Sequence, residues 1–188
     1  MKRRRFLESS AAAIFAPYWL ERAFAALPSS PAEDAQAHVI PADEDRLGER
    51  HSLGFSNIHF KVLPRETSGS LFLIEHSNLQ KGGGPALHLH YAQEEYFYVL
   101  EGTVLFQLGE KRVEFHPGDS VLGPRGVPHT FTPTSEKPGH MLIAFTPAGQ
   151  MEDFFREAGK PGAPPPDAAF FARFGLKWLG PPISAATP

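Results

Sequence analysis

The chain has 188 residues, with 18 Lys and Arg against 21 Asp and Glu, which gives a formal net charge of -3. This near-balance gives no general reason to expect nucleic-acid binding, and a hydrophobic content of 41% is sufficient for one globular core. The chain contains no Cys, which excludes disulfides, thiolate nucleophiles and Cys-ligated zinc or iron–sulfur sites.

Residues 1–25 have the features of an export signal. A basic start is followed by an apolar run over 9–20 and by Ala23-Phe24-Ala25, a tripeptide of the kind that signal peptidase cuts after. The Arg-Arg-x-Phe-Leu string at 3–7 resembles the bacterial twin-arginine signal, which a receptor reads and which is no membrane anchor. We therefore expect a twin-arginine-type signal peptide and a periplasmic or otherwise exported protein without a stable membrane anchor. The alternative is a basic start followed by an ordinary amphipathic helix.

The remaining chain divides by its hydrophobic pattern. Residues 26–50 lack periodicity and predict a linker or N-terminal arm. From about residue 55 the pattern has period two, with Ile58, Phe60 and Val62 alternating with polar residues. Many short strands separated by Gly and Pro turns predict an all-β sandwich or barrel over 51–148. The short apolar segments lie at 71–74, 87–90, 96–100, 103–108, 113–115, 120–122, 130–132 and 141–145.

The period changes after Pro147. Met151, Phe154 and Phe155 are spaced for one face of a helix over 150–158. Asp167 is placed to cap a second helix over 168–174. We expect residues 149–188 to form a short C-terminal helical extension.

Three histidines of the predicted barrel have a spacing that suits metal binding. His88 and His90 are two residues apart on an expected strand, so both side chains leave the same face, roughly 6.6 Å apart at Cα. His129 follows a Pro-Gly turn and opens another strand, from which it can supply a third imidazole across the barrel.

The carboxylate partner is either Glu95 or its neighbour Glu94. Glu95 shares a strand face with Phe97 and Val99, which is typical of a barrel interior. Glu94 shares the opposite face with two tyrosines, which suit a more exposed surface, so we favour Glu95.

Three neutral imidazoles and one carboxylate suit one divalent transition metal ion, namely Fe, Mn, Ni, Cu, Zn or Co. In an octahedral site they leave two positions open for water, dioxygen or a bidentate substrate, whereas a structural zinc site is closed. Phe97, Val99 and Phe131 lie on the same faces as the ligands and are candidate pocket walls. We interpret His76 and His140 as satisfied or exposed histidines.

Two segments that contain these residues resemble the signature motifs of the cupin superfamily. Carried over by position, the metal ligands of that family fall on His88, His90, Glu95 and His129. Pro133 stands where the second motif often has Asn, a departure that affects no ligand. The resemblance covers about residues 55–147 and implies a double-stranded β-helix, the jelly-roll barrel. The two segments are Gly82-x5-His88-x-His90-x4-Glu95-x6-Gly102 and Gly118-x5-Pro124-x-Gly126-x2-His129.

The chain's tail is similar to that of small bacterial cupins described as quercetin-dioxygenase-like. The expected function is a metal-dependent, dioxygenase-like enzyme that acts on a small oxygenated organic substrate, with Glu95 also serving as the catalytic base. The alternatives are a non-catalytic cupin that binds a small ligand, and a decarboxylase or isomerase that uses the same site. No nucleic-acid partner is expected, and a homodimer is plausible because small cupins are often dimers.

Overall fold

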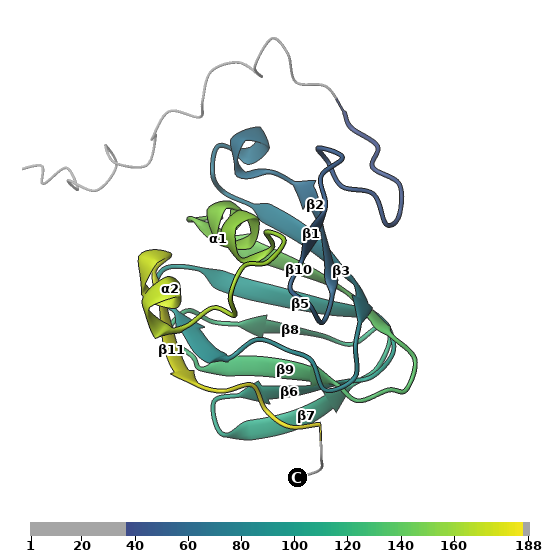
Figure 1. Ribbon diagram of the computed structural model, residues 1–188, viewed down its shortest axis with the longest axis vertical. Coiled ribbons are helices and arrows are strands. Elements are labelled where there is room, and N and C mark those ends of the chain that lie inside the picture. Colours follow the sequence, from purple (N-terminus) through teal and green to yellow (C-terminus); the bar gives the residue numbers. More distant parts are fainter. Residues whose placement is uncertain (1–36, 186–188) are drawn as a thin grey trace, which may run out of the picture. The chain divides into compact units, whose positions relative to one another are not determined.

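Short strands in two antiparallel sheets form the framework of the described residues (Figure 1). The computed structural model describes residues 37–185, so the predicted signal peptide and residues 26–36 of the predicted linker lie outside the described residues. The predicted all-β jelly-roll fold is confirmed. The elements are β1 (His51–Ser52), β2 (Asn57–Val62), the 3-10 turn η1 (Pro64–Thr67), β3 (Phe72–Leu79), β4 (Leu87–His90), β5 (Glu94–Glu101), β6 (Val104–Leu108), β7 (Lys111–Phe115), β8 (Ser120–Gly123), β9 (His129–Pro133), β10 (Gly139–Thr146), α1 (Met151–Ala158), α2 (Ala168–Arg173) and β11 (Leu176–Gly180).

The order of the strands explains how distant residues meet. One sheet has the order β1-β2-β3-β10-β5-β8 and the other the order β11-β4-β9-β6-β7. Between β3 and β10 the chain passes repeatedly from one sheet to the other, with β4, β6, β7 and β9 in one sheet and β5 and β8 in its partner. Side chains that leave the inner faces of β4, β5 and β9 therefore point into the same space between the two sheets.

One apolar core fills that space and follows the predicted alternation. On β5, Phe97 and Val99 are buried while Tyr96 and Tyr98 are partly exposed on the outer face. On β10 the buried positions again alternate, as with Phe145. Because full burial of such a side chain stabilises a fold by roughly 1.5–3 kcal/mol, these inner faces fix the register of both sheets.

The C-terminal extension packs against the barrel. Both expected helices form, and the Asp167 carboxylate caps α2 by accepting a hydrogen bond from the backbone N–H of Phe170 at 2.8 Å. The extension then ends in a strand, β11, which pairs with β4 so that Trp178 lies opposite His88. The residues that follow the predicted barrel thus cover the strand that carries two of the candidate ligands. No helix in residues 37–185 has the length and apolar character needed to cross a membrane.

Candidate metal centre

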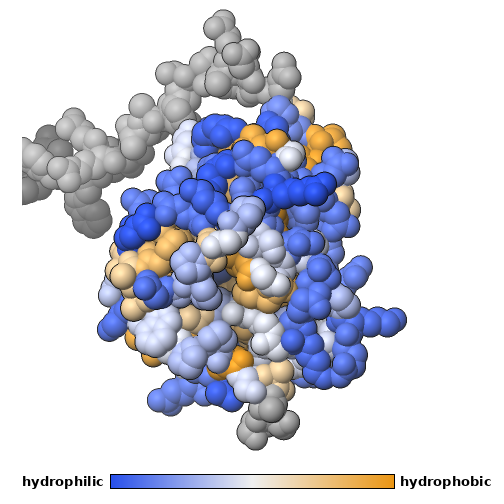
Figure 2. Space-filling view, in the orientation of Figure 1, coloured by the Kyte–Doolittle hydropathy of each residue, from blue (hydrophilic) through white to orange (hydrophobic). Residues whose placement is uncertain are grey.

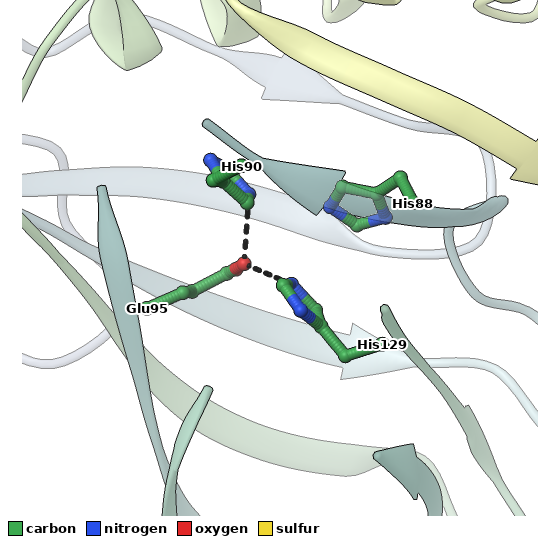
Figure 3. A group of neighbouring side chains, drawn as sticks. All are labelled: His88, His90, Glu95 and His129. Carbon is green, nitrogen blue, oxygen red and sulfur yellow. Dashed lines mark hydrogen bonds and ion pairs between the residues drawn. The ribbon is translucent and has the colours of Figure 1, made fainter. Parts of the chain in front are cut away.

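Four side chains from three strands converge in the barrel (Figure 3). His88 and His90 come from β4, Glu95 from β5 and His129 from β9. One potential ligand atom of each residue lies within 4.8 Å of those of the other three, and all four residues are buried. The structure therefore brings together the four residues that the sequence singled out.

Local backbone contacts set the positions of these side chains. His88 and His129 are direct partners in the pairing of β4 with β9. Gly126 turns the chain just before β9 at a φ of 77°, a left-handed conformation that glycine adopts without strain. Its N–H donates a hydrogen bond to the backbone oxygen of His90 at 2.7 Å, which ties this turn to the strand opposite.

Two of the imidazoles are oriented by backbone carbonyls. The Nδ1 atom of His88 lies 2.7 Å from the oxygen of Ala86, and the Nδ1 atom of His129 lies 2.9 Å from the oxygen of Val127. A carbonyl oxygen can only accept, so each Nδ1 carries the proton. The Nε2 atom of each ring is left to face the centre, which is how histidine ligands are commonly held.

His90 has buried ring nitrogens that the protein leaves without hydrogen bonds. Neither its Nδ1 nor its Nε2 atom has a hydrogen-bond partner, although Nε2 lies 3.1 Å from Oε2 of Glu95. A buried polar group without a partner costs roughly 1–3 kcal/mol. A metal ion bound by Nε2 would remove part of this cost, so His90 fits the proposed role of a ligand.

Charge in this centre is concentrated on Glu95 and His129. Burial opposes the charge of Glu95, but the hydrogen bond with His129 and the proximity of the His90 imidazole outweigh it and hold the carboxyl pKa well below its usual range. Burial also opposes the charge on His129, but Oε2 of Glu95, 2.8 Å from its Nε2, raises the pKa of His129. Burial, assisted by the charge of His129, lowers the pKa of His88 to about 3, so this ring is neutral. The buried carboxylate thus favours positive charge at this centre, which a bound metal ion would supply.

The two adjacent glutamates have different surroundings. Glu94 lies on the outer face of β5, where its carboxylate forms a two-pronged ion pair with Arg125, with 2.5 Å between Oε2 and Nη2. The Arg125 guanidinium lowers the pKa of Glu94. Glu94 therefore points away from the histidines, and Glu95 is the carboxylate that joins them.

A cavity of about 1180 Å³ leads to the centre and is lined by His88, His90 and Glu95. In Figure 2, pale and apolar surface occupies the middle of one face, with hydrophilic surface around it. Pockets of this size commonly hold organic ligands. Half of the buried apolar residues that line the cavity are phenylalanines, namely Phe131, Phe145, Phe154, Phe155 and Phe171.

The predicted pocket walls are correct in part. Phe131 lines the cavity, but Phe97 and Val99 are buried in the core and are not among the lining residues. The sequence reasoning missed Phe171, whose ring lies 5.3 Å from that of His88, and Phe145, whose ring lies 5.8 Å from that of His90. Hydrophobic spacing marked helix faces in the extension but gave no sign that these faces meet the ligands.

A second group of potential ligands lies where the segment before β1 meets β3 and β10. Asp43, Glu75 and His140 have ligand atoms within 4.8 Å of one another. Glu75 already forms ion pairs with Lys61 and His140, so its buried carboxylate is neutralised without a metal ion. His140 is therefore a satisfied histidine, as expected from the sequence. His76, for which the same was expected, is buried, and its Nε2 atom has no partner.

Comparisons with known proteins agree with this architecture. The family profile described as "Cupin domain" matches residues 75–145, a range that includes all four converging side chains. An uncharacterized protein from Methanocaldococcus jannaschii is 33% identical over 115 residues, which make up 61% of this chain and 92% of the relative. The structure of an RmlC-like cupin from Shewanella frigidimarina aligns with a TM-score of 0.52 at 21% identity, covering 63% of this chain and 96% of that one.

Proposed function

This chain belongs to the cupin family, and we propose that it is a metal-dependent enzyme that acts on a small oxygenated organic molecule. In this proposal His88, His90, Glu95 and His129 hold one divalent ion. The observation that carries it is the convergence of these four buried groups at a cavity large enough for an organic ligand. A closed structural site would have no need of such an opening.

The donor set suits Fe, Mn, Ni, Cu, Zn or Co. Such an ion, when bound, supplies a Lewis-acidic centre that can polarise a substrate oxygen and, if it is redox-active, can exchange electrons with dioxygen. The neutral state of His88 and the Nδ1 contacts of His88 and His129 prepare two imidazoles to bind through Nε2.

The protein's own groups would position the substrate and handle its proton. Phe145 and Phe171 pack against ligand histidines and keep bulk water away from them. Glu95 is the one carboxylate among the described residues that line the cavity, which makes it the candidate base for a substrate proton. Its low pKa makes it a weak base, so it would accept a proton only as its contact with His129 is loosened.

Dioxygenase-like chemistry is our first candidate reaction, and non-catalytic ligand binding, decarboxylation and isomerisation are the alternatives. The test is metal analysis of protein purified without oxygen, followed by assays of oxygen uptake and carbon dioxide release on a panel of flavonols, enediols and small carboxylic acids. Oxygen uptake that depends on the metal supports the first candidate. Bound metal without turnover of any kind would favour a binding protein, and failure to bind any divalent metal would overturn the proposed site.

We further propose that the protein acts outside the cytoplasm. The support is the order of basic start, apolar run and Ala23-Phe24-Ala25 in the sequence. Fractionation of bacterial cells that express the full chain should recover it in the periplasm, and replacement of Arg3 and Arg4 by Lys should retain it in the cytoplasm. Equal export of both proteins would contradict a twin-arginine signal.

A further inference from the structure

His76 is a buried polar residue of the cavity wall that lies outside the four-residue centre. It comes from β3 and is only 2% exposed. Among the described residues that line the cavity, it is the one buried polar side chain besides His88, His90 and Glu95. Its Nε2 atom has no hydrogen-bond partner in the protein. Leaving this nitrogen unpaired costs roughly 1–3 kcal/mol, and because His76 lines the cavity, an occupant of the cavity is the candidate for the missing partner.

Ser56 decides which nitrogen of His76 carries the proton. The Ser56 hydroxyl oxygen lies 3.2 Å from Nδ1 of His76, and both residues are 2% exposed. If Nδ1 carried the proton, the buried hydroxyl hydrogen of Ser56 would lose this acceptor. If the hydroxyl donates to Nδ1 instead, Nδ1 is the acceptor and the proton of the neutral ring lies on Nε2. The second arrangement satisfies the Ser56 donor and leaves the other ring nitrogen, in a residue of the cavity wall, as an unpaired N–H donor.

The surroundings of His76 keep this donor uncharged and flanked by aromatic rings. Burial lowers the pKa of His76 to about 3, an effect that the charge of Glu95 only partly offsets. The rings of Phe131 and Phe155 lie edge-on to the imidazole at centroid distances of 6.2 and 6.0 Å. A ligand beside His76 therefore meets apolar walls and one neutral hydrogen-bond donor.

We propose that His76 is a specificity-determining residue whose Nε2–H donates a hydrogen bond to an acceptor oxygen of the substrate. The inference rests on the proposed function, in which another part of the substrate reaches the metal centre. Strand geometry puts the Cα atoms of His76 and Glu95 roughly 16 Å apart, two strands across and four residues along the sheet. The class of substrate is therefore a largely apolar molecule that spans the space between His76 and the centre and carries an acceptor oxygen, such as a carbonyl or ether, remote from the group that reacts.

The probes for this proposal are fluorenone and fluorene, planar three-ring molecules that differ by one carbonyl oxygen. Calorimetry on the zinc-loaded protein should give a preference for fluorenone of about five- to tenfold, as expected for one neutral hydrogen bond. This preference should fall to about one in His76→Leu and return in part in His76→Gln, which keeps an N–H donor. The infrared carbonyl band of bound fluorenone should lie at lower frequency in the wild type than in His76→Leu.

His116→Leu is the matched control, because His116 lies in an exposed turn outside the cavity lining. It should leave the preference unchanged. Nitrogen NMR should find the His76 proton on Nε2 in the wild type, and Ser56→Ala should shift part of it to Nδ1. An unchanged preference in His76→Leu, an unshifted carbonyl band in the wild type, or a proton on Nδ1 would each overturn the proposal.

These outcomes separate the role of His76 from the proposed metal site. Zinc stoichiometry, measured on every variant, checks that the barrel is intact and that the centre binds metal. If the wild type bound no zinc, the proposed function would fail, and the same probe pair would still test His76 in the metal-free protein. If His76→Leu did not fold, the infrared band and the NMR spectrum of the wild type would decide the question.

Discussion

Replacing Glu95 by Gln should remove most of the metal affinity while leaving the fold intact. The amide has nearly the same shape as the carboxylate, and its N–H can donate to Nε2 of a neutral His129, the atom that now lies 2.8 Å from the carboxylate. Loss of outer partners of metal ligands typically lowers affinity by about 10–100-fold, so loss of the one anionic ligand should lower it by at least about 100-fold.

Thermal unfolding with and without zinc turns this loss of metal affinity into a measurable difference in the midpoint temperature of unfolding. At one hundred times its dissociation constant, zinc stabilises the wild type by about 2.7 kcal/mol, and at about 2–4 °C per kcal/mol the midpoint should rise by about 5–10 °C. A 100-fold weaker site at the same zinc concentration gains only about 0.4 kcal/mol, or roughly 1–2 °C. Glu94→Gln is the matched control and should keep the full shift, because Glu94 pairs with Arg125 on the outer face. A full zinc shift in Glu95→Gln, or its loss in Glu94→Gln, would refute the assignment of Glu95 as the ligand.

Three further predictions concern protons and packing. Metal binding should displace the proton that His129 binds with a raised pKa, so metal affinity should fall as the pH falls. Calorimetry in buffers of different ionisation enthalpy measures the protons released on binding, and no release at any pH would contradict this prediction. Acid should destabilise the metal-free protein from about pH 6.5 down to about pH 3, because His76 of the unfolded chain binds a proton in this range and the buried ring does not. The unfolding free energy, measured with urea at several pH values, should fall less steeply with pH in His76→Leu than in the wild type. Phe171→Ala should cost about 3–5 kcal/mol of unfolding free energy, since Phe171 is 3% exposed and packs on His88, whereas the exposed Tyr91→Ala should cost far less.

The positions of the ligands depend on short-range rules that the sequence displays. Strand side chains alternate between two faces, so the spacing of His88 and His90 was enough to place both on one face. The same rule separated Glu95 from Glu94, because their neighbours on β5 differ in polarity, and the structure places Glu95 among the histidines. The turn that precedes His129 was recognisable from its Pro and Gly.

Contacts between distant segments were decided only by the tertiary structure. Phe171 lies 83 residues beyond His88 (171 − 88), and no local pattern indicated that α2 would bring its ring against that histidine. The pairing of β11 with β4 and the meeting of Ser56 with His76 likewise join segments whose contact no periodicity encodes. The sequence by itself determined the four candidate ligands, since alternation and turns are local properties of the chain. The tertiary structure decided the cavity walls and the unpaired nitrogen of His76, because both depend on which distant faces pack together.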